Sequence, residues 1–236
     1  MKLYGRNCIV ERLKKNPKSI KNIFIETGVD IDELLIASVK NNHIPVESIT
    51  KNDFHRKSQG IPSQGIIAEV EEFKYVYLED ILRKKDILLF LDNLNDPQNL
   101  GSILRTAACF GGFAVVLPKH DSVEVTEAVL RVAQGGENYV PIAKVTNLAI
   151  AIEKAKKAEY WIAGTVTSGG ENAASVKLNF PLGIVIGSEG KGIRQGLISH
   201  LDFKLTLPMA GADLSFNASV AAALFCYESV RQRLSS

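Results

Sequence analysis

The sequence has 236 residues, which suits one large domain or two small ones. Hydrophobic residues make up 46% and charged residues 23%, values typical of a globular protein with a normal core, and the formal net charge of +2 is too small to indicate a nucleic-acid partner by itself. No run approaches the roughly 18 apolar residues of a membrane helix, and the first residues lack the apolar run of a signal peptide.

The first 70 residues or so contain short alternating elements, which predict a small α/β unit. Helices are expected over 7–15, from a cap at Asp30 to Asn42, and over 52–58. Strands are expected over 22–26, 46–49 and 66–70. A charged and aromatic stretch follows, and we interpret it as a linker that includes a turn or two of helix.

From Ile87 onward the pattern is more regular. Apolar runs of strand length recur at 87–91, 113–117, 161–165, 182–186 and 203–207. Because helical patterns separate most of these runs, we predict a parallel sheet that helices cover on both faces. One helix has an apolar face formed by Leu100, Ile103, Leu104, Ala107 and Ala108. The last helix has an apolar face formed by Val220, Ala223, Leu224, Tyr227, Val230 and Leu234.

The loop after the first of these strands, Asp92–Asn99, contains no glycine. Ligands of open α/β sheets bind at the carboxyl ends of the strands, and a dinucleotide site needs glycines in this loop. A NAD-dependent dehydrogenase and the common Rossmann type of methyltransferase are therefore disfavoured. Asn99 is a candidate cap of the next helix, and Arg105 lies on that helix away from its apolar face.

Three later loops contain glycine, at Thr167–Gly170, Gly187–Gly192 and Pro208–Gly211. They would meet at one edge of the predicted sheet and could enclose a ligand. The Gly-Lys pair at 190–191 does not fit a P-loop, since Val185 stands where the first glycine belongs. A loop with Glu189 suits a ligand that has a positive centre or ribose hydroxyls. The four scattered histidines predict no metal site and no Ser-His-Asp triad.

Three segments resemble, in the right order, the motifs of the SpoU/TrmH (SPOUT) family of RNA 2′-O-ribose methyltransferases. The segments are Asn95–Gly101 with Arg105–Ala107, then Ile186–Gly192, then Leu207–Met209 with Ser215–Ala221. Tyr4–Asn7, Gln64–Ala68 and Val145–Ala149 are similar to the branch that methylates a guanosine of 23S rRNA. Two departures from the usual pattern are Phe216, where leucine is common, and Ser63, where histidine is common.

The resemblance implies an α/β fold whose parallel sheet ends in a C-terminal deep trefoil knot, a rare exception to the rule against knots. A small L30e-like α/β domain that binds RNA would precede it. We place the first domain at 1–72, a linker at 73–86 and the methyltransferase domain at 87–236. The family is homodimeric with its site near the dimer interface, and small residues of the last helix, Ala218 and Ala221–Ala223, are candidates for that interface.

The resemblance also assigns roles at the site. S-adenosylmethionine (SAM) would be the methyl donor, and no metal would be needed. Arg105 would bind the acceptor and stabilise a developing alkoxide, while Asn99 would orient Arg105 or the ribose. Glu189 would hold a ribose or the arginine, and Ser215 and Asn217 would line the SAM and substrate side. The expected SAM contacts are Thr165, Gly187, Gly190, Leu207, Met209 and Phe216.

The expected partners are ribosomal RNA and a second copy of the chain, with no membrane. The three cysteines, Cys8, Cys109 and Cys226, are odd in number and lie far apart in the sequence, so they predict no disulfide framework. Their free thiols favour a location in the reducing cytoplasm. Two alternatives stay open at this point. One is a tRNA 2′-O-ribose methyltransferase, and the other is a non-catalytic RNA-binding factor for ribosome assembly.

Overall fold

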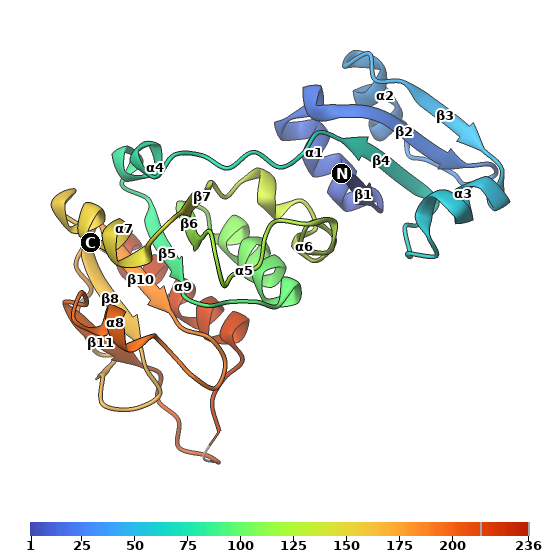
Figure 1. Cartoon of the computed structure of the whole chain (residues 1–236). Coiled ribbons are helices and arrows are strands. Elements are labelled where there is room, and N and C mark those ends of the chain that lie inside the picture. Colours follow the sequence, from blue (N-terminus) through green and yellow to red (C-terminus); the bar gives the residue numbers. More distant parts are fainter. Residues whose placement is uncertain (213, 236) are drawn as a thin grey trace.

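The computed structural model describes residues 1–212 and 214–235 and contains two β-sheets, one in each of two units (Figure 1). The first sheet has the order β1-β4-β2-β3, with antiparallel pairing of β4 to both β1 and β2 and parallel pairing of β2 to β3. Its strands are β1 (Lys2–Tyr4), β2 (Ile20–Glu26), β3 (Val46–Ile49) and β4 (Ile66–Val70). Its helices are α1 (Arg6–Lys15), η1 (Pro17–Ser19), α2 (Glu33–Asn41) and α3 (Lys51–Ser58).

The start of α2 corrects the sequence prediction. The N-cap is Asp32 rather than Asp30, because the Asp32 carboxylate accepts a hydrogen bond of 2.8 Å from the backbone N–H of Leu35. Capping satisfies one of the backbone donors that the first turn of a helix leaves free, so the side chain with this geometry sets where the helix begins.

The second sheet is parallel, as predicted, and has the order β7-β6-β5-β10-β8-β11-β9. Its strands are β5 (Ile87–Leu91), β6 (Phe113–Pro118), β7 (Ile142–Val145), β8 (Trp161–Thr165), β9 (Glu171–Asn172), β10 (Leu182–Ile186) and β11 (Phe203–Thr206). Its helices are α4 (Leu78–Lys84), α5 (Pro97–Phe110), α6 (Glu127–Ala133), η2 (Gly136–Asn138), α7 (Leu148–Lys157), α8 (Gln195–Ile198) and α9 (Ala218–Leu234). No helix of the described residues is both long and apolar enough to cross a bilayer.

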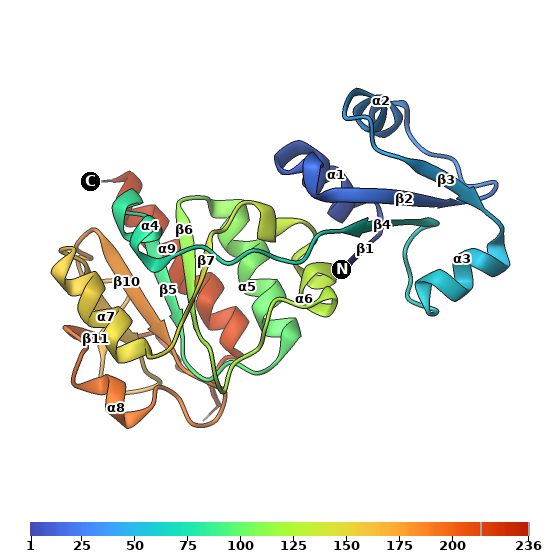
Figure 2. The same ribbon diagram turned by 45° about the horizontal axis from the view of Figure 1, so that its top comes forward.

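Helices cover both faces of the parallel sheet, as Figure 2 shows. Along β5, Ile87, Leu89 and Leu91 belong to the apolar cluster beneath α5, α6 and α9. Leu88 and Phe90 belong to the cluster beneath α4, α7 and α8. All five side chains are buried, since successive residues of a strand point to opposite faces and both faces are covered.

Helix α9 turns a different face to the core than the sequence suggested. Ala218, Ala222, Phe225, Cys226 and Ser229 are its buried residues. Val220, Leu224, Tyr227 and Leu234 are exposed. Over Ala218–Tyr227 the helix is apolar on nearly every side, so periodicity alone could not choose the buried face. Ala218 and Ala222, expected at a dimer interface, are instead packed inside the protomer.

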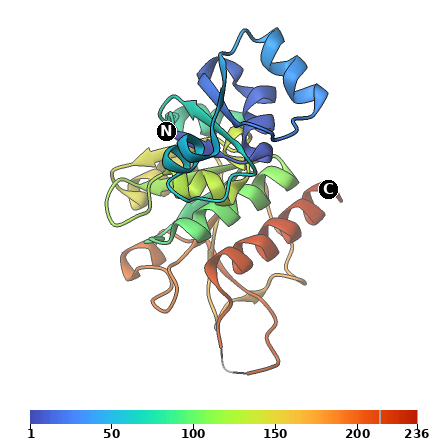
Figure 3. The same ribbon diagram turned by 90° about the vertical axis from the view of Figure 1, so that its right-hand side faces the viewer.

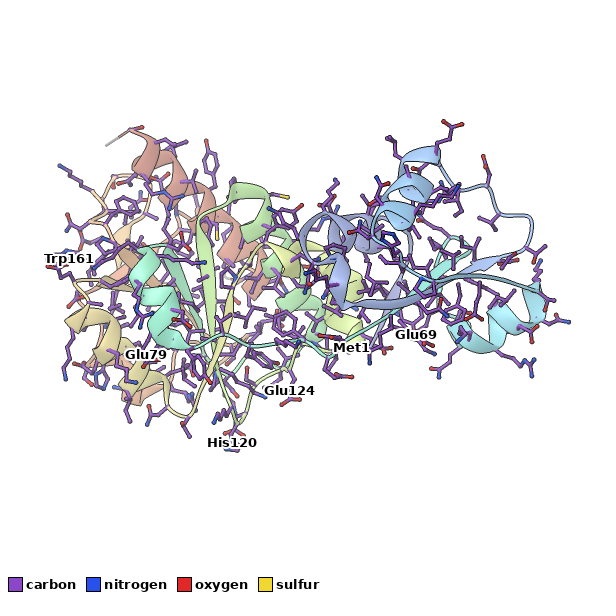
Figure 4. All side chains as sticks on the ribbon, turned by 90° about the horizontal axis from the view of Figure 1, so that it is seen from above. Met1, Glu69, Glu79, His120, Glu124 and Trp161 are labelled. Atoms are coloured by element: carbon purple, nitrogen blue, oxygen red, sulfur yellow. The ribbon has the colours of Figure 1, made fainter. Side chains whose placement is uncertain are left out.

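The two units are packed against each other. Leu3 and Ile9 of the first unit share one apolar cluster with Val129 and Leu130 of α6. The segment that joins the units lies along the second sheet, where Val76 forms a β-bridge with Ala143. In Figure 4, Met1 lies between the units. Glu69 lies on the first unit, and Trp161 lies at the end of the second unit that is far from the first.

A buried ion pair crosses this interface. Arg12 of α1 contacts Glu137 of η2 at 3.1 Å, and their side chains are 7% and 0% exposed. Burial raises the pKa of Glu137, and the neighbouring Arg12 opposes that shift. Glu127 of α6 accepts two further hydrogen bonds, from the backbone N–H of Lys2 at 2.7 Å and from the hydroxyl of Tyr4 at 3.2 Å. Polar contacts therefore fix how the first unit sits on the second.

Candidate functional site

A cavity of about 340 Å³ lies at the carboxyl ends of the central parallel strands. Three segments that follow strands form much of its wall, at Thr165–Thr167, Ile186–Ile193 and Leu207–Met209. Side chains of Ile198 and Phe225 and the segment around Ser215 and Phe216 complete it. This is the edge at which open α/β sheets bind ligands, and it lies far from the first unit in Figure 3.

The loop after β10 is a closed turn. The backbone N–H of Ser188 donates to the carbonyl oxygen of Gly192 at 3.2 Å, and the N–H of Gly192 donates back at 2.9 Å. A Cβ on Gly187 would lie 2.1 Å from the carbonyl carbon of Gly192, so only glycine fits there. Gly190 has a φ of +77°, which disfavours other residues. The glycines therefore let the backbone of this loop fold into a tight turn and approach the cavity.

Asn99, Glu189 and Asn217 form a hydrogen-bonded triangle beside the cavity. The Asn99 amide donates to Glu189 Oε1 at 2.9 Å, and the Asn217 amide donates to Asn99 Oδ1 at 3.0 Å. The Asn217 amide also donates to Glu189 Oε1. The three residues come from α5, the loop after β10 and the start of α9. The triangle therefore ties together all three motifs that the resemblance singled out.

Asn99 does not cap its helix, contrary to one sequence prediction. Asp96 is the N-cap of α5, with its carboxylate 2.8 Å from the backbone N of Gln98, and Pro97 occupies the first turn. The Asn99 side chain, 5% exposed, is thus free to point toward Glu189 and Asn217. Asn217 does cap a helix: its Oδ1 accepts from the backbone N of Ser219 at 2.9 Å at the start of α9.

Glu189 keeps one oxygen available. Its Oε1 receives the amides of Asn99 and Asn217, and the backbone N–H of Ala218 lies at 3.4 Å. Among residues 1–212 and 214–235, no side chain or backbone group donates to Oε2. An oxygen of this kind can accept a hydrogen bond from a ligand hydroxyl or a guanidinium.

Arg105 does not reach the cavity of its own chain. It is exposed on α5, and the part of the chain that the structure describes offers it no hydrogen bond or ion pair. Its Cα packs against Gly136 of η2, where an added Cβ would lie 2.9 Å away. Within one chain, Asn99 therefore hydrogen-bonds to Glu189 and Asn217 rather than to Arg105.

Eight of the eleven predicted site residues line the cavity, namely Thr165, Gly187, Glu189, Gly190, Leu207, Met209, Ser215 and Phe216. Asn99 and Asn217 hydrogen-bond to Glu189 without lining the cavity, and Arg105 contacts neither the cavity nor these residues. The prediction missed apolar wall residues such as Ile198 and Phe225. Helical periodicity marks such residues only as core, so no local signal identified them as part of a site.

The residues that line the cavity fit a ligand with an apolar body and with hydroxyl or cationic groups. Ile186, Leu207 and Phe216 give apolar walls, and Glu189 gives a carboxylate beside them. The adenine, ribose and sulfonium of SAM match this combination. Across the described ranges, no group of three or more His, Cys, Asp or Glu side chains is placed to hold a metal ion.

Comparison with known families confirms the resemblance seen in the sequence. The SpoU rRNA methylase family model matches residues 86–227, and a model described as RNA 2′-O ribose methyltransferase substrate binding matches residues 2–76. A protein of Bacillus subtilis, named within the TrmH family of tRNA/rRNA methyltransferases, is 36% identical, covering 97% of this chain and 94% of its own length. The 23S rRNA (guanosine-2′-O-)-methyltransferase RlmB of Pseudomonas putida is 35% identical, covering 98% and 96%.

Solved structures agree with this fold. The SpoU methyltransferase AviRb of Streptomyces viridochromogenes, in complex with AdoMet, superposes with a TM-score of 0.83 at 21% identity, covering 100% of this chain and 91% of that one. The A. aeolicus TrmH/SpoU tRNA modifying enzyme superposes with a TM-score of 0.57 at 26% identity, covering 67% and 83%. With the matching family model over most of the second unit and relatives that align along nearly the whole chain, this protein belongs to the SpoU rRNA methylase family.

Proposed function

We propose that the protein transfers a methyl group from SAM to the ribose 2′-OH of a guanosine in 23S rRNA. The observation that carries the proposal is the hydrogen-bonded triangle of Asn99, Glu189 and Asn217 at the edge of a cavity lined by the other motif residues. The AdoMet complex of AviRb, which has the same fold, supports this cavity as the SAM site.

SAM supplies a methyl group that is already activated on a sulfonium, so the chain has to hold it and prepare the acceptor. Backbone groups of Gly187 and Gly190 and the side chains of Leu207, Met209 and Phe216 would surround it, together with Thr165. Glu189 Oε2 would accept a hydrogen bond from a ribose hydroxyl, and the Ser215 hydroxyl would donate or accept one. These contacts would align donor and acceptor for an in-line displacement.

Arg105 is the residue we assign to the acceptor nucleotide. A guanidinium beside the RNA phosphate would stabilise negative charge on the 2′ oxygen as its proton leaves to the phosphate or to water. Since Arg105 does not reach the cavity of its own chain, we propose that the site is completed in a homodimer by the partner's Arg105.

Exposed apolar residues support self-association. Phe110 of α5 and Val220, Leu224 and Tyr227 of α9 are 37% to 56% exposed, although large apolar side chains are usually buried. The rings of Phe110 and Tyr227 contact each other, with centroids 6.4 Å apart, so both helices contribute to one patch. A second copy of the chain that covers this patch would bring α5 of each protomer near the interface.

The first unit would bind the RNA. The proposed boundaries are 1–72, 73–86 and 87–236, and residues 213 and 236 of the last range lie outside the described residues. Its four-stranded sheet with three α-helices and the substrate-binding family match at 2–76 support an L30e-like domain. A deep trefoil knot near the C-terminus is part of the same proposal. It is supported by β10 lying between β5 and β8, and by the two loops after β10 and β11 sharing one cavity.

The rRNA target rests on the relatives named RlmB, while the Bacillus subtilis relative is named for both tRNA and rRNA. We also propose that the protein acts in the reducing cytoplasm, where both RNAs are found. The test is to incubate the protein with methyl-labelled SAM and rRNA that lacks the modification, then to map the label by nuclease digestion and mass spectrometry. We expect one labelled guanosine ribose in 23S rRNA. Label only on tRNA would overturn the target, and no label on any RNA would overturn the activity.

A further inference from the structure

We infer that Asp92 is a positioning residue that sets the shape of the SAM loop, defined here as Gly187–Arg194, by binding Arg194. The inference rests on the proposed function, because it assigns the cavity to SAM. Asp92 was not among the predicted site residues, and it does not line the cavity. It follows directly after β5, whereas Arg194 is 102 residues further along the chain.

The geometry between Asp92 and Arg194 is specific. The carboxylate of Asp92 has no exposed side-chain surface, and each of its oxygens has its own donor. Oδ2 accepts from the backbone N–H of Arg194 at 2.8 Å, and Oδ1 accepts from the Arg194 Nε at 2.6 Å. A buried carboxylate with two such donors is a strong anchor, because charge-assisted hydrogen bonds strengthen away from water.

Asp92 itself is fixed by the sheet. Its backbone N–H donates to the carbonyl oxygen of Ile186 at 2.8 Å, which continues the pairing of β5 with β10 by one residue. Ile186 is the last residue of β10 and directly precedes the SAM loop. Asp92 therefore holds both ends of the loop, Ile186 through its backbone and Arg194 through its side chain.

Because the SAM loop is held at both ends, few backbone conformations remain accessible to it. Within it, Ser188 and Gly192 close a turn, and Gly187 leaves no room for a side chain. The turn carries Glu189 to the position where its Oε1 meets Asn99 and Asn217. Release of the Arg194 end would let the loop and Glu189 move away from the cavity. Binding of SAM would then have to order the loop again, which weakens affinity.

The variants Asp92→Asn and Arg194→Ala test the inference through the affinity for SAM, measured by calorimetry on the full chain without RNA. Each should weaken SAM binding about tenfold or more, as expected for losing a hydrogen bond to a charged group. The double variant should bind SAM no more weakly than the single variant with the lower affinity, because the two residues act through each other. Arg194→Lys should recover part of the affinity.

Asp202→Asn is the matched control. Asp202 also accepts a backbone N–H, from Ile162 at 2.8 Å, and also binds a cation, Lys156 at 2.7 Å, but at the amino ends of the strands. Its replacement should lower the melting temperature and leave SAM affinity unchanged. If Asp92→Asn does not fold, Arg194→Ala decides the matter, since that side chain is 48% exposed.

Unchanged SAM affinity in Arg194→Ala, or additive effects in the double variant, would overturn the inference. So would weaker RNA binding with intact SAM binding in Arg194→Ala, because Arg194 would then be an RNA contact. A wild-type chain that binds SAM but methylates no RNA would overturn the proposed function alone. A wild-type chain that binds no SAM would overturn both.

Discussion

Glu189 accepts a hydrogen bond of 2.9 Å from the side-chain amide of Asn99, although 90 residues separate the two along the chain. One residue belongs to the loop after β10 and the other to the first turn of α5. The contact places the first motif, at the start of the second unit, against the second motif, in the loop after β10. It also leaves Glu189 Oε2 directed to no other described group, which suits a carboxylate that serves a ligand.

Replacing Asn99 should impair methyl transfer through Glu189. Asn99→Ala removes one donor to Oε1 and should reduce kcat/KM about tenfold, the scale of a hydrogen bond to a charged group. Asn99→Asp should be worse, because it places a second carboxylate beside Glu189. Steady-state kinetics with SAM and RNA varied in turn measures both. If Asn99→Asp retains more activity than Asn99→Ala, the assigned contact does not matter for the reaction.

Arg105→Ala should abolish turnover and leave SAM binding nearly intact, because Arg105 lies outside the cavity of its own chain. If the site is shared between protomers, mixing Arg105→Ala with Glu189→Gln should restore activity. Random exchange would give one intact site in half of the dimers, or about a quarter of wild-type activity.

The control mixture is Glu189→Gln with Asn99→Asp, whose defects fall within the same chain's site. No mixed dimer would then hold an intact site, so that mixture should be no more active than the average of the two variants measured separately. Absence of recovery in the first mixture would show that Arg105 does not act across the interface.

The pair Arg12 and Glu137 should stabilise the docking of the first unit on the second. Glu137→Leu leaves the Arg12 guanidinium buried without a counter-charge and should cost about 3 kcal/mol or more in the free energy of unfolding. The double variant Arg12→Leu/Glu137→Leu should lose less than the sum of the two single variants. Urea unfolding measures these values, and additive losses would mean that the two side chains do not interact.

Much of the fold could be predicted from apolar patterning. The strands at 46–49, 66–70, 87–91, 161–165 and 182–186 have the bounds that were expected. Strands β1 and β9, with three and two residues, are too short to show a period, and β7 was also missed. The prediction of the buried face of α9 was wrong, because Ala218 and Ala222 are buried while Val220 and Leu224 are exposed.

The site was predictable only as far as the motifs reach. Gly187, Glu189 and Phe216 could be found as parts of the motifs, and they do line the cavity. That Asn99 would meet Asn217 depends on how α5 and α9 pack, which no local pattern contains. Asp92 and Arg194 were missed for the same reason, because a buried carboxylate and its partner 102 residues away look like unrelated polar residues in the sequence.

The proposed reaction is tested by finding which atom of the RNA receives the methyl group. Two synthetic RNA fragments that carry the mapped guanosine should be compared, one with its 2′-OH and one with hydrogen in that place, each with methyl-labelled SAM. A ribose 2′-O-methyltransferase should label the first fragment and leave the second unlabelled, with both bound equally well. Label on the fragment that lacks the 2′-OH would mean that the base is methylated and that the proposed reaction is wrong.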